Sequence, residues 1–159
     1  MNILILGVGN FLLSDEGIGI HVVNTLLKDY NIPPDVSVID GGTAGMELLN
    51  FIRETKHLIL IDAVKTGQPP ATVVTLSESE IPALFKNKMS IHQLGLSDVL
   101  AAANLTGVAP ETMTLIGIVP VSLELGTELS SEVQQQLPQL LTLVQHAVEK
   151  LGHHLALKS

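Results

Sequence analysis

Short runs of aliphatic residues alternate along this chain with segments whose apolar residues recur every three or four positions. The near-continuous runs predict strands that are buried on both faces, and they cover residues 2–7, 36–40, 57–63, 71–76 and 112–119. The spaced pattern predicts amphipathic helices, over residues 16–30, 44–54, 91–104 and 131–151. An alternation of strands and helices is typical of a mostly parallel sheet with helices on both faces.

We therefore predict a single α/β domain over residues 1–152, built as a three-layer α/β/α sandwich around a mostly parallel, twisted sheet of about five strands. The connection over residues 64–70 is too short for a helical crossover. The strand at 71–76 is therefore predicted to be antiparallel and to lie at the edge of the sheet. Residues 153–159 are expected to form a loose tail.

Two of the predicted helices carry further local signals. Ser90 and Gln93 form the S-x-x-Q pattern of a capping box at the start of the third helix, and Gly107 follows that helix as a C-terminal stop. Pro138 lies inside the last helical pattern, where a proline removes a hydrogen bond. It is expected to kink that helix or to delay its start.

The composition narrows the possible partners. The chain has 159 residues, no cysteine and a formal net charge of −8. This charge argues against nucleic acid and anionic membranes as partners, and the lack of cysteine excludes disulfides, thiolate metal sites and cysteine nucleophiles. No apolar run reaches the roughly 18 residues of a membrane span, and the start lacks the basic region of a signal peptide. We expect a soluble, cytoplasmic protein.

The segment after the first predicted strand begins like a dinucleotide-binding loop. An apolar run leads into Gly7-x-Gly9, but Leu12 stands where a Rossmann fingerprint has its third glycine. Asp15 and Glu16 follow, where a pyrophosphate would bind. Because a helix N-terminus favours anions, two carboxylates at this point repel a phosphate. They suit a cation, or a carboxylate that takes part in chemistry.

Polar residues also follow other predicted strands. Asp40 ends the second strand, Asp62 ends the third, and His92 opens the third long helix. Because ligands bind outside the carboxyl ends of strands in open α/β sheets, we expect these residues and Glu16 to share one edge. The mixed oxygen and nitrogen donors of Glu16, Asp62 and His92 suit a divalent metal such as nickel or zinc and would leave coordination positions open.

Each of these residues also has a structural interpretation. Glu16 alone would be a solvated acid in the first turn of a helix, and Asp62 would be a cap or turn acid. Asp40 would be a turn acid or the ribose-binding acid of a Rossmann fold, and His92 would be a surface histidine. Their joint placement at one sheet edge favours the functional interpretation.

Five blocks of sequence, in order along nearly the whole chain, resemble the [NiFe]-hydrogenase maturation proteases. The first block is the most specific, since it combines G-x-G-N with a carboxylate-Gly-x-Gly. The blocks are Gly7-x-Gly9-Asn10 with Asp15-Glu16-Gly17-x-Gly19; Asp40-Gly41-Gly42-Thr43; Ile61-Asp62-Ala63; His92-Gln93 with Asp98-Val99-Leu100; and Gly117-x-x-Pro120 with Gly126 and Leu129-Ser130.

The resemblance implies a concrete function. Members of this family are endopeptidases that remove a short C-terminal extension from the precursor of the hydrogenase large subunit after nickel has been inserted. Their metal-contacting triad corresponds to Glu16, Asp62 and His92, and the acid implicated in activity corresponds to Asp40. The implied partner is the large-subunit precursor. Nickel is supplied by this substrate, and no nucleotide cofactor is expected.

Three mechanisms are compatible with these residues. Nickel seated in the substrate could serve as a recognition element, or Glu16 and Asp62 could activate water as in an aspartic-type peptidase, with Asp40 assisting and one pKa raised by like charge. In the third, the metal activates the water. We favour substrate-borne nickel, because three ligands leave room to share a metal. A dinucleotide-binding oxidoreductase and a non-enzymatic nickel metallochaperone are the alternative functions.

Overall fold

The computed structural model of the chain describes residues 2–84 and 91–159, apart from the side chains of Ile91, His92 and Leu94. Its main sheet contains β1 (Ile3–Val8), β3 (Val36–Gly42), β4 (His57–Ala63), β5 (Val73–Ser77) and β6 (Thr112–Ile118). The strand order is β3-β1-β4-β6-β5. The first four strands in this order are parallel, and β5 is antiparallel to β6 at the edge. The predicted antiparallel edge strand is confirmed.

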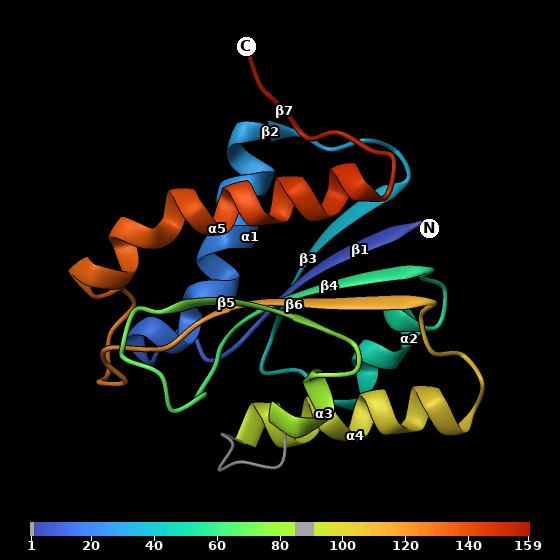
Figure 1. Cartoon of the computed structure of the whole chain (residues 1–159), viewed down its shortest axis with the longest axis horizontal. Helices are drawn as coiled ribbons and strands as arrows, with labels where there is room; N and C mark the ends of the chain where they lie inside the picture. Colours follow the sequence, from blue (N-terminus) through green and yellow to red (C-terminus); the bar gives the residue numbers. More distant parts are fainter. Residues whose placement is uncertain (1, 85–90) are drawn as a thin grey trace.

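Helices cover both faces of the sheet, which confirms the three-layer sandwich (Figure 1). On one face lie α1 (Ile18–Asp29) and α5 (Ser131–Lys150), and on the other lie α2 (Leu49–Ile52), α3 (Ile81–Leu84) and α4 (Ile91–Leu105). The alternating side chains of the strands pack into two separate aliphatic cores, one under each helical layer. Among the described residues, no helix has the length and apolar character needed to cross a membrane.

Two helix starts differ from the sequence prediction, whereas α5 begins where it was predicted to begin. The segment before α1 is a 3-10 turn, η1 (Ser14–Gly17), and the helix predicted over 44–54 is a 3-10 turn, η2 (Met46–Leu48), followed by the short α2. Pro138 does not delay α5. The Ser130 hydroxyl caps the first turn by accepting a hydrogen bond from the Val133 amide at 3.4 Å, so the helix already begins at Ser131.

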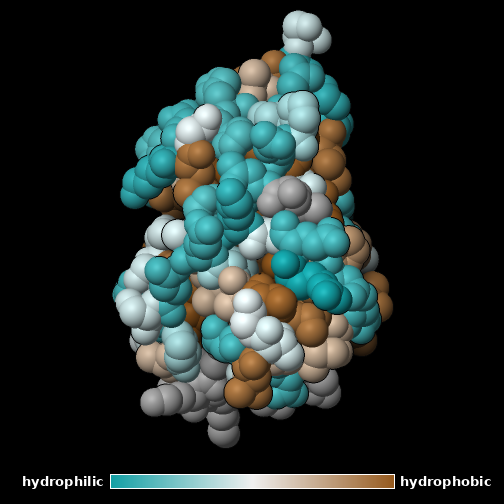
Figure 2. Space-filling view, turned by 90° about the vertical axis from the view of Figure 1, so that its right-hand side faces the viewer, coloured by the Kyte–Doolittle hydropathy of each residue, from teal (hydrophilic) through white to brown (hydrophobic). Residues whose placement is uncertain are grey.

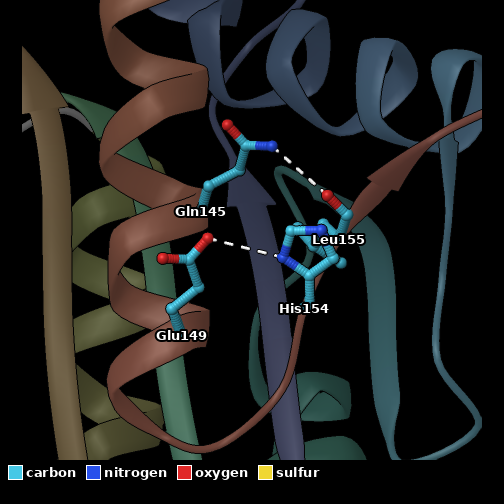
Figure 3. A network of polar contacts seen from close by, with 4 residues as sticks. All are labelled: Gln145, Glu149, His154 and Leu155. Atoms are coloured by element: carbon cyan, nitrogen blue, oxygen red, sulfur yellow. Dashed lines mark hydrogen bonds and ion pairs between the residues drawn. The ribbon is translucent and has the colours of Figure 1, made fainter.

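The C-terminal segment is docked, in contrast to the expected loose tail. The two-residue β7 (Ala156–Leu157) pairs antiparallel with β2 (Tyr30–Asn31). Leu155 is only 1% exposed, and its carbonyl accepts a hydrogen bond from Gln145 Nε2 at 3.3 Å (Figure 3). His154 forms an ion pair with Glu149 at 3.4 Å. A single buried leucine and a two-residue pairing leave no periodic pattern in the sequence.

Candidate functional site

The candidate site lies at the carboxyl ends of β1 and β4, on the left in Figure 1. From β1 the chain continues to β3 on one side, and from β3 it crosses over to β4 on the other side of β1. The gap between β1 and β4 is therefore the point where the strand order reverses, which is where open α/β sheets bind ligands. Figure 2 shows the opposite end of the sheet, where hydrophilic and hydrophobic residues are intermixed.

Asp62 is a buried carboxylate at this point, with 1% of its surface exposed. Ile61 packs into the core beneath α1 and α5, so the alternation along β4 directs Asp62 toward the opposite layer and α4. There its Oδ2 accepts a hydrogen bond from Gln93 Nε2 at 3.1 Å. The same amide nitrogen donates to the carbonyl of Ala63 at 2.8 Å. A buried carboxylate requires such partners, because removing a charge from water is costly.

Gly9 allows the turn after β1 to lie directly beside Asp62. Its φ of +133° is a conformation that favours glycine, and its amide donates to the carbonyl of Gly42 at 2.9 Å. A Cβ at this position would overlap the carbonyl oxygen of Glu16 and would lie 3.5 Å from Asp62 Oδ1. The absence of a side chain at Gly9 therefore lets the backbone of Glu16 approach the Asp62 carboxylate.

Gly19 permits a similar close approach one turn later. A Cβ on Gly19 would overlap the carbonyl oxygens of Val8 and Ile61, so the first turn of α1 packs directly on the ends of β1 and β4. The glycines of the first sequence block thus hold η1 and α1 against the strand ends. These glycines allow close backbone packing and do not form a phosphate-binding loop. The turn η1, with Asp15 and Glu16, occupies the position expected for a pyrophosphate.

Glu16 lies in η1 and is only 8% exposed, so it is not the solvated helix acid of the structural interpretation. Its amide donates to the carbonyl of Leu13 at 3.1 Å, which closes the 3-10 turn. The turn and the end of β4 meet across Gly9, as described above. Glu16 and Asp62 therefore come from segments in direct contact, as the strand-end argument predicted.

Asp15 has a different role from its neighbour. It is 0% exposed, and its Oδ2 accepts hydrogen bonds from the amides of Val121 and Ser122, both at 2.9 Å. Ser130 adds two more, from its amide to Oδ1 and from its hydroxyl to Oδ2, both at 2.8 Å. Asp15 is thus the anchor of the loop between β6 and α5. The sequence pattern did not separate this structural acid from Glu16, because only the distant loop supplies its partners.

Further bonds join the same loop to the turn after β1. The amide of Gly126 donates to the carbonyl of Leu12 at 2.9 Å, and the amide of Ser14 donates to the carbonyl of Gly126 at 2.9 Å. The hydroxyl of Ser14 donates to the carbonyl of Glu124 at 2.5 Å. Leu12 and Leu125 point their exposed side chains into solvent from these bonded loops. The rim of the site is therefore apolar at its tip and held in place by these hydrogen bonds.

Asp40 lies at the same sheet edge but in a separate pocket. Both Asp40 and Ile61 pair with Gly7, so their two side chains lie on the same face of the sheet, the α1 side, away from Asp62. Asp40 is exposed, and its Oδ1 accepts a hydrogen bond from the amide of Gly42 at 2.9 Å. It lines a pocket of about 400 Å³ together with Gly9, Asn10, Phe11, Leu12, Ile20, Asn24, Gly42 and Thr43. Neither Glu16 nor Asp62 lines this pocket.

His92 is the second residue of α4, and its side chain lies outside the described part of the structure. Among the residues that are described, no group of three histidine, aspartate or glutamate side chains could hold a metal ion. Ser90 of the predicted capping box also lies outside the described residues. Gln93, the other member of that box, directs its amide nitrogen to Asp62 and Ala63, a role that the sequence pattern did not predict.

His21 is a second histidine near this edge. Its Nε2 donates to the carbonyl of Thr127 at 3.1 Å, and its ring lies 5.1 Å from the ring of Phe11. Burial lowers the pKa of His21 below 6.5, and the bond to Thr127 and the charge of Asp15 oppose this effect only in part. His21 therefore helps to hold the β6–α5 loop as a neutral imidazole at pH 7.

These features define a class of single-domain α/β proteins with buried carboxylates at the switch point of a mostly parallel sheet. The dinucleotide-binding alternative is disfavoured, because the backbone of Glu16 and the anchor Asp15 fill the turn that a pyrophosphate would need. The comparison with known proteins gives a more specific result. A family model described as hydrogenase maturation protease matches residues 20–147.

Individual relatives agree with this match. The chain is 46% identical to the hydrogenase 2 maturation protease of Escherichia coli over 153 residues, which cover 96% of this chain and 93% of the relative. It is 38% identical to the hydrogenase expression/formation protein HupD of Rhizobium leguminosarum, over 94% of this chain and 75% of that protein. The chain belongs to the hydrogenase maturation protease family.

Solved structures support the same assignment. The hydrogenase maturating endopeptidase HybD from Escherichia coli superposes with a TM-score of 0.95 at 45% identity, over 99% of this chain and 98% of that one. The [NiFe] hydrogenase maturation protease HybD from Thermococcus kodakarensis gives a TM-score of 0.74 at 29% identity, over 96% of this chain and 100% of that one. The fold and the family together identify the chain as an endopeptidase.

Proposed function

We propose that this endopeptidase removes the C-terminal extension from the nickel-loaded precursor of a [NiFe]-hydrogenase large subunit, and that it does so in the cytoplasm. One observation carries the proposal within this protease family. The carboxylate of Asp62 is buried at the switch point of the sheet, beside Gly9, and the backbone of Glu16 packs against the same glycine. Because burying an acid costs free energy, a buried acid at a ligand-binding edge is a candidate functional residue.

The metal-facing role is assigned to Glu16, Asp62 and His92. Carboxylate oxygen and imidazole nitrogen suit nickel, which is part of the substrate in this proposal. The residue after His92 contacts Asp62 through its amide, so the first turn of α4 lies beside the Asp62 carboxylate. Three protein ligands leave positions at which the precursor could keep its own hold on the metal. Nickel then identifies a precursor that is ready for cleavage.

The peptide is proposed to lie across the neighbouring pocket. Asp40 is exposed in its wall, and the pocket volume of about 400 Å³ has room for part of an extended chain. Glu16 and Asp62 are the carboxylates proposed to activate the attacking water, and Asp40, which points away from Asp62, is proposed to contribute to activity from the peptide pocket. Leu12, which lines this pocket, and Leu125, on the loop that is hydrogen-bonded to Leu12, are exposed leucines that offer an apolar contact for the precursor.

The decisive experiment compares nickel-loaded and nickel-free precursor as substrates, with mass spectrometry of the large subunit after incubation. Cleavage of the loaded form alone supports recognition through the metal, and equal cleavage of both forms refutes it. Asp62→Asn and His92→Ala should abolish processing. Glu54→Gln, at an exposed position before the start of β4, serves as the control. Full cleavage by the Asp62 and His92 variants would disprove the site assignment.

A further inference from the structure

Gln93 is a buried polar residue whose amide group is fully committed on its donor side. Its Nε2 donates to Asp62 Oδ2 at 3.1 Å and to the carbonyl of Ala63 at 2.8 Å. A primary amide nitrogen carries two protons, so both are used. Both acceptors belong to the last two residues of β4. The side chain therefore joins the first turn of α4 to the end of the strand that carries Asp62.

The two bonds have different consequences for the site. The bond to Oδ2 fixes the plane of the Asp62 carboxylate, whose Oδ1 lies on the side of Gly9. The bond to the Ala63 carbonyl fixes the position of α4 along β4. His92 directly precedes Gln93 in the first turn of α4, so the same bond also positions the backbone of His92 relative to the end of β4.

We infer that Gln93 is a positioning residue for the metal-facing site, which orients the Asp62 carboxylate and holds the first turn of α4 in register with it. This inference rests on the proposed function of Glu16, Asp62 and His92. It goes beyond that assignment, because Gln93 touches neither metal nor peptide in it. Residues that orient metal ligands in this way commonly change metal affinity or activity by about 10–100-fold when they are replaced.

The chemistry at this position is narrow. A glutamate carboxylate has no proton to donate to Asp62 Oδ2 or to the Ala63 carbonyl. An asparagine side chain is one methylene too short to reach both acceptors. Methionine has a similar length and no donor. Gln93→Met therefore removes both bonds with little change in volume. Gln145 offers a matched control, because its amide also donates to a backbone carbonyl, that of Leu155 at 3.3 Å, away from the site.

The test measures two quantities for wild type, Gln93→Met and Gln145→Met. The first is the rate of cleavage of nickel-loaded precursor, and the second is the ratio of binding affinities for nickel-loaded and nickel-free precursor. Thermal unfolding followed by circular dichroism checks that each variant is folded. We expect Gln93→Met to lower both the rate and the affinity ratio at least tenfold, and Gln145→Met to leave both unchanged. A residue with a purely structural role would not lower the affinity ratio.

The outcomes separate this inference from the proposed function. If wild type binds and cleaves both precursors equally, recognition through nickel fails, and the basis of the inference fails with it. If wild type prefers the nickel-loaded precursor and Gln93→Met has the same cleavage rate and the same affinity ratio as wild type, the role of Gln93 is refuted while the proposed function stands. Should Gln93→Met give no folded protein, Gln93→Asn is measured in the same way, and wild-type values for that variant overturn the inference.

Discussion

Replacing Asp15 with asparagine would test whether this acid anchors the loop between β6 and α5. Its carboxylate accepts four hydrogen bonds, three at Oδ2 and one at Oδ1. An asparagine can keep its oxygen at the three-donor side only by turning its NH2 group toward the amide of Ser130. This arrangement loses one bond, weakens the charge assistance of the others and sets a donor against a buried donor.

The expected loss of unfolding free energy in Asp15→Asn follows from these changes. A hydrogen bond to a charged group contributes about 1.5–3 kcal/mol, and an unsatisfied buried polar group costs about 1–3 kcal/mol. We therefore expect Asp15→Asn to lower the free energy of unfolding by about 3–5 kcal/mol, a large part of the roughly 5–15 kcal/mol of a typical domain. Urea unfolding followed by circular dichroism measures the change. Asp98→Asn is the control, expected to stay within about 0.5 kcal/mol of wild type because Asp98 is exposed.

Hydrogen exchange locates the effect. The amides of Val121, Ser122 and Ser130 donate to Asp15, so their protection should fall in Asp15→Asn more than that of the strand amides. If the variant unfolds within about 1 kcal/mol of wild type and these three amides keep their protection, the anchoring role is refuted.

Three further predictions concern other parts of the chain. Gly9→Ala should give little folded protein and no processing, since its Cβ would overlap a neighbouring carbonyl oxygen, whereas Gly95→Ala, within α4, would make only an ordinary contact at 3.8 Å and should still fold. Because the pKa of His21 is lowered below 6.5 in the folded state, the unfolded state binds more protons below that pH. Thermal stability should therefore fall as the pH drops from about 7 to 5, and less so in His21→Gln. Removing the chain from Leu155 onward should cost about 2–3 kcal/mol of unfolding free energy through lost burial. His154→Ala should cost less than about 0.5 kcal/mol, since its ion pair is exposed. A truncated chain as stable as wild type would show that the docked tail contributes nothing.

The five strands of the main sheet and the long helices followed from local pattern, whereas the short β2 and β7 did not. Aliphatic runs buried on both faces gave β4 its predicted bounds, and the short connection after it correctly required an antiparallel edge strand. Local pattern was weaker where a turn competes with a helix. The first turn before α1 is 3-10, and it packs closely on the strand ends because Gly9 and Gly19 carry no side chain there.

The site could be predicted only in part. The sequence shows acids after β1 and near the carboxyl ends of β3 and β4, and the parallel order places all of them at one edge. The direction of each side chain depends on register, which pairs Asp40 and Ile61 with the same residue of β1 and thereby turns Asp40 away from Asp62. No local pattern encodes that register, so the separate pocket of Asp40 could not be foreseen.

By itself the sequence determined the layers, the sheet edge and the resemblance to the maturation proteases, because burial periodicity and motif spacing act over short stretches of chain. Tertiary structure alone decided which acid does what. Asp15 and Glu16 are neighbours in the chain, yet one anchors a loop that follows β6 and the other lies in the turn against Asp62. Gln93 was similarly a capping residue by pattern and a partner of Asp62 in space. The physical reason is that a buried polar group takes its role from its hydrogen-bond partners, and the fold supplies these from distant segments.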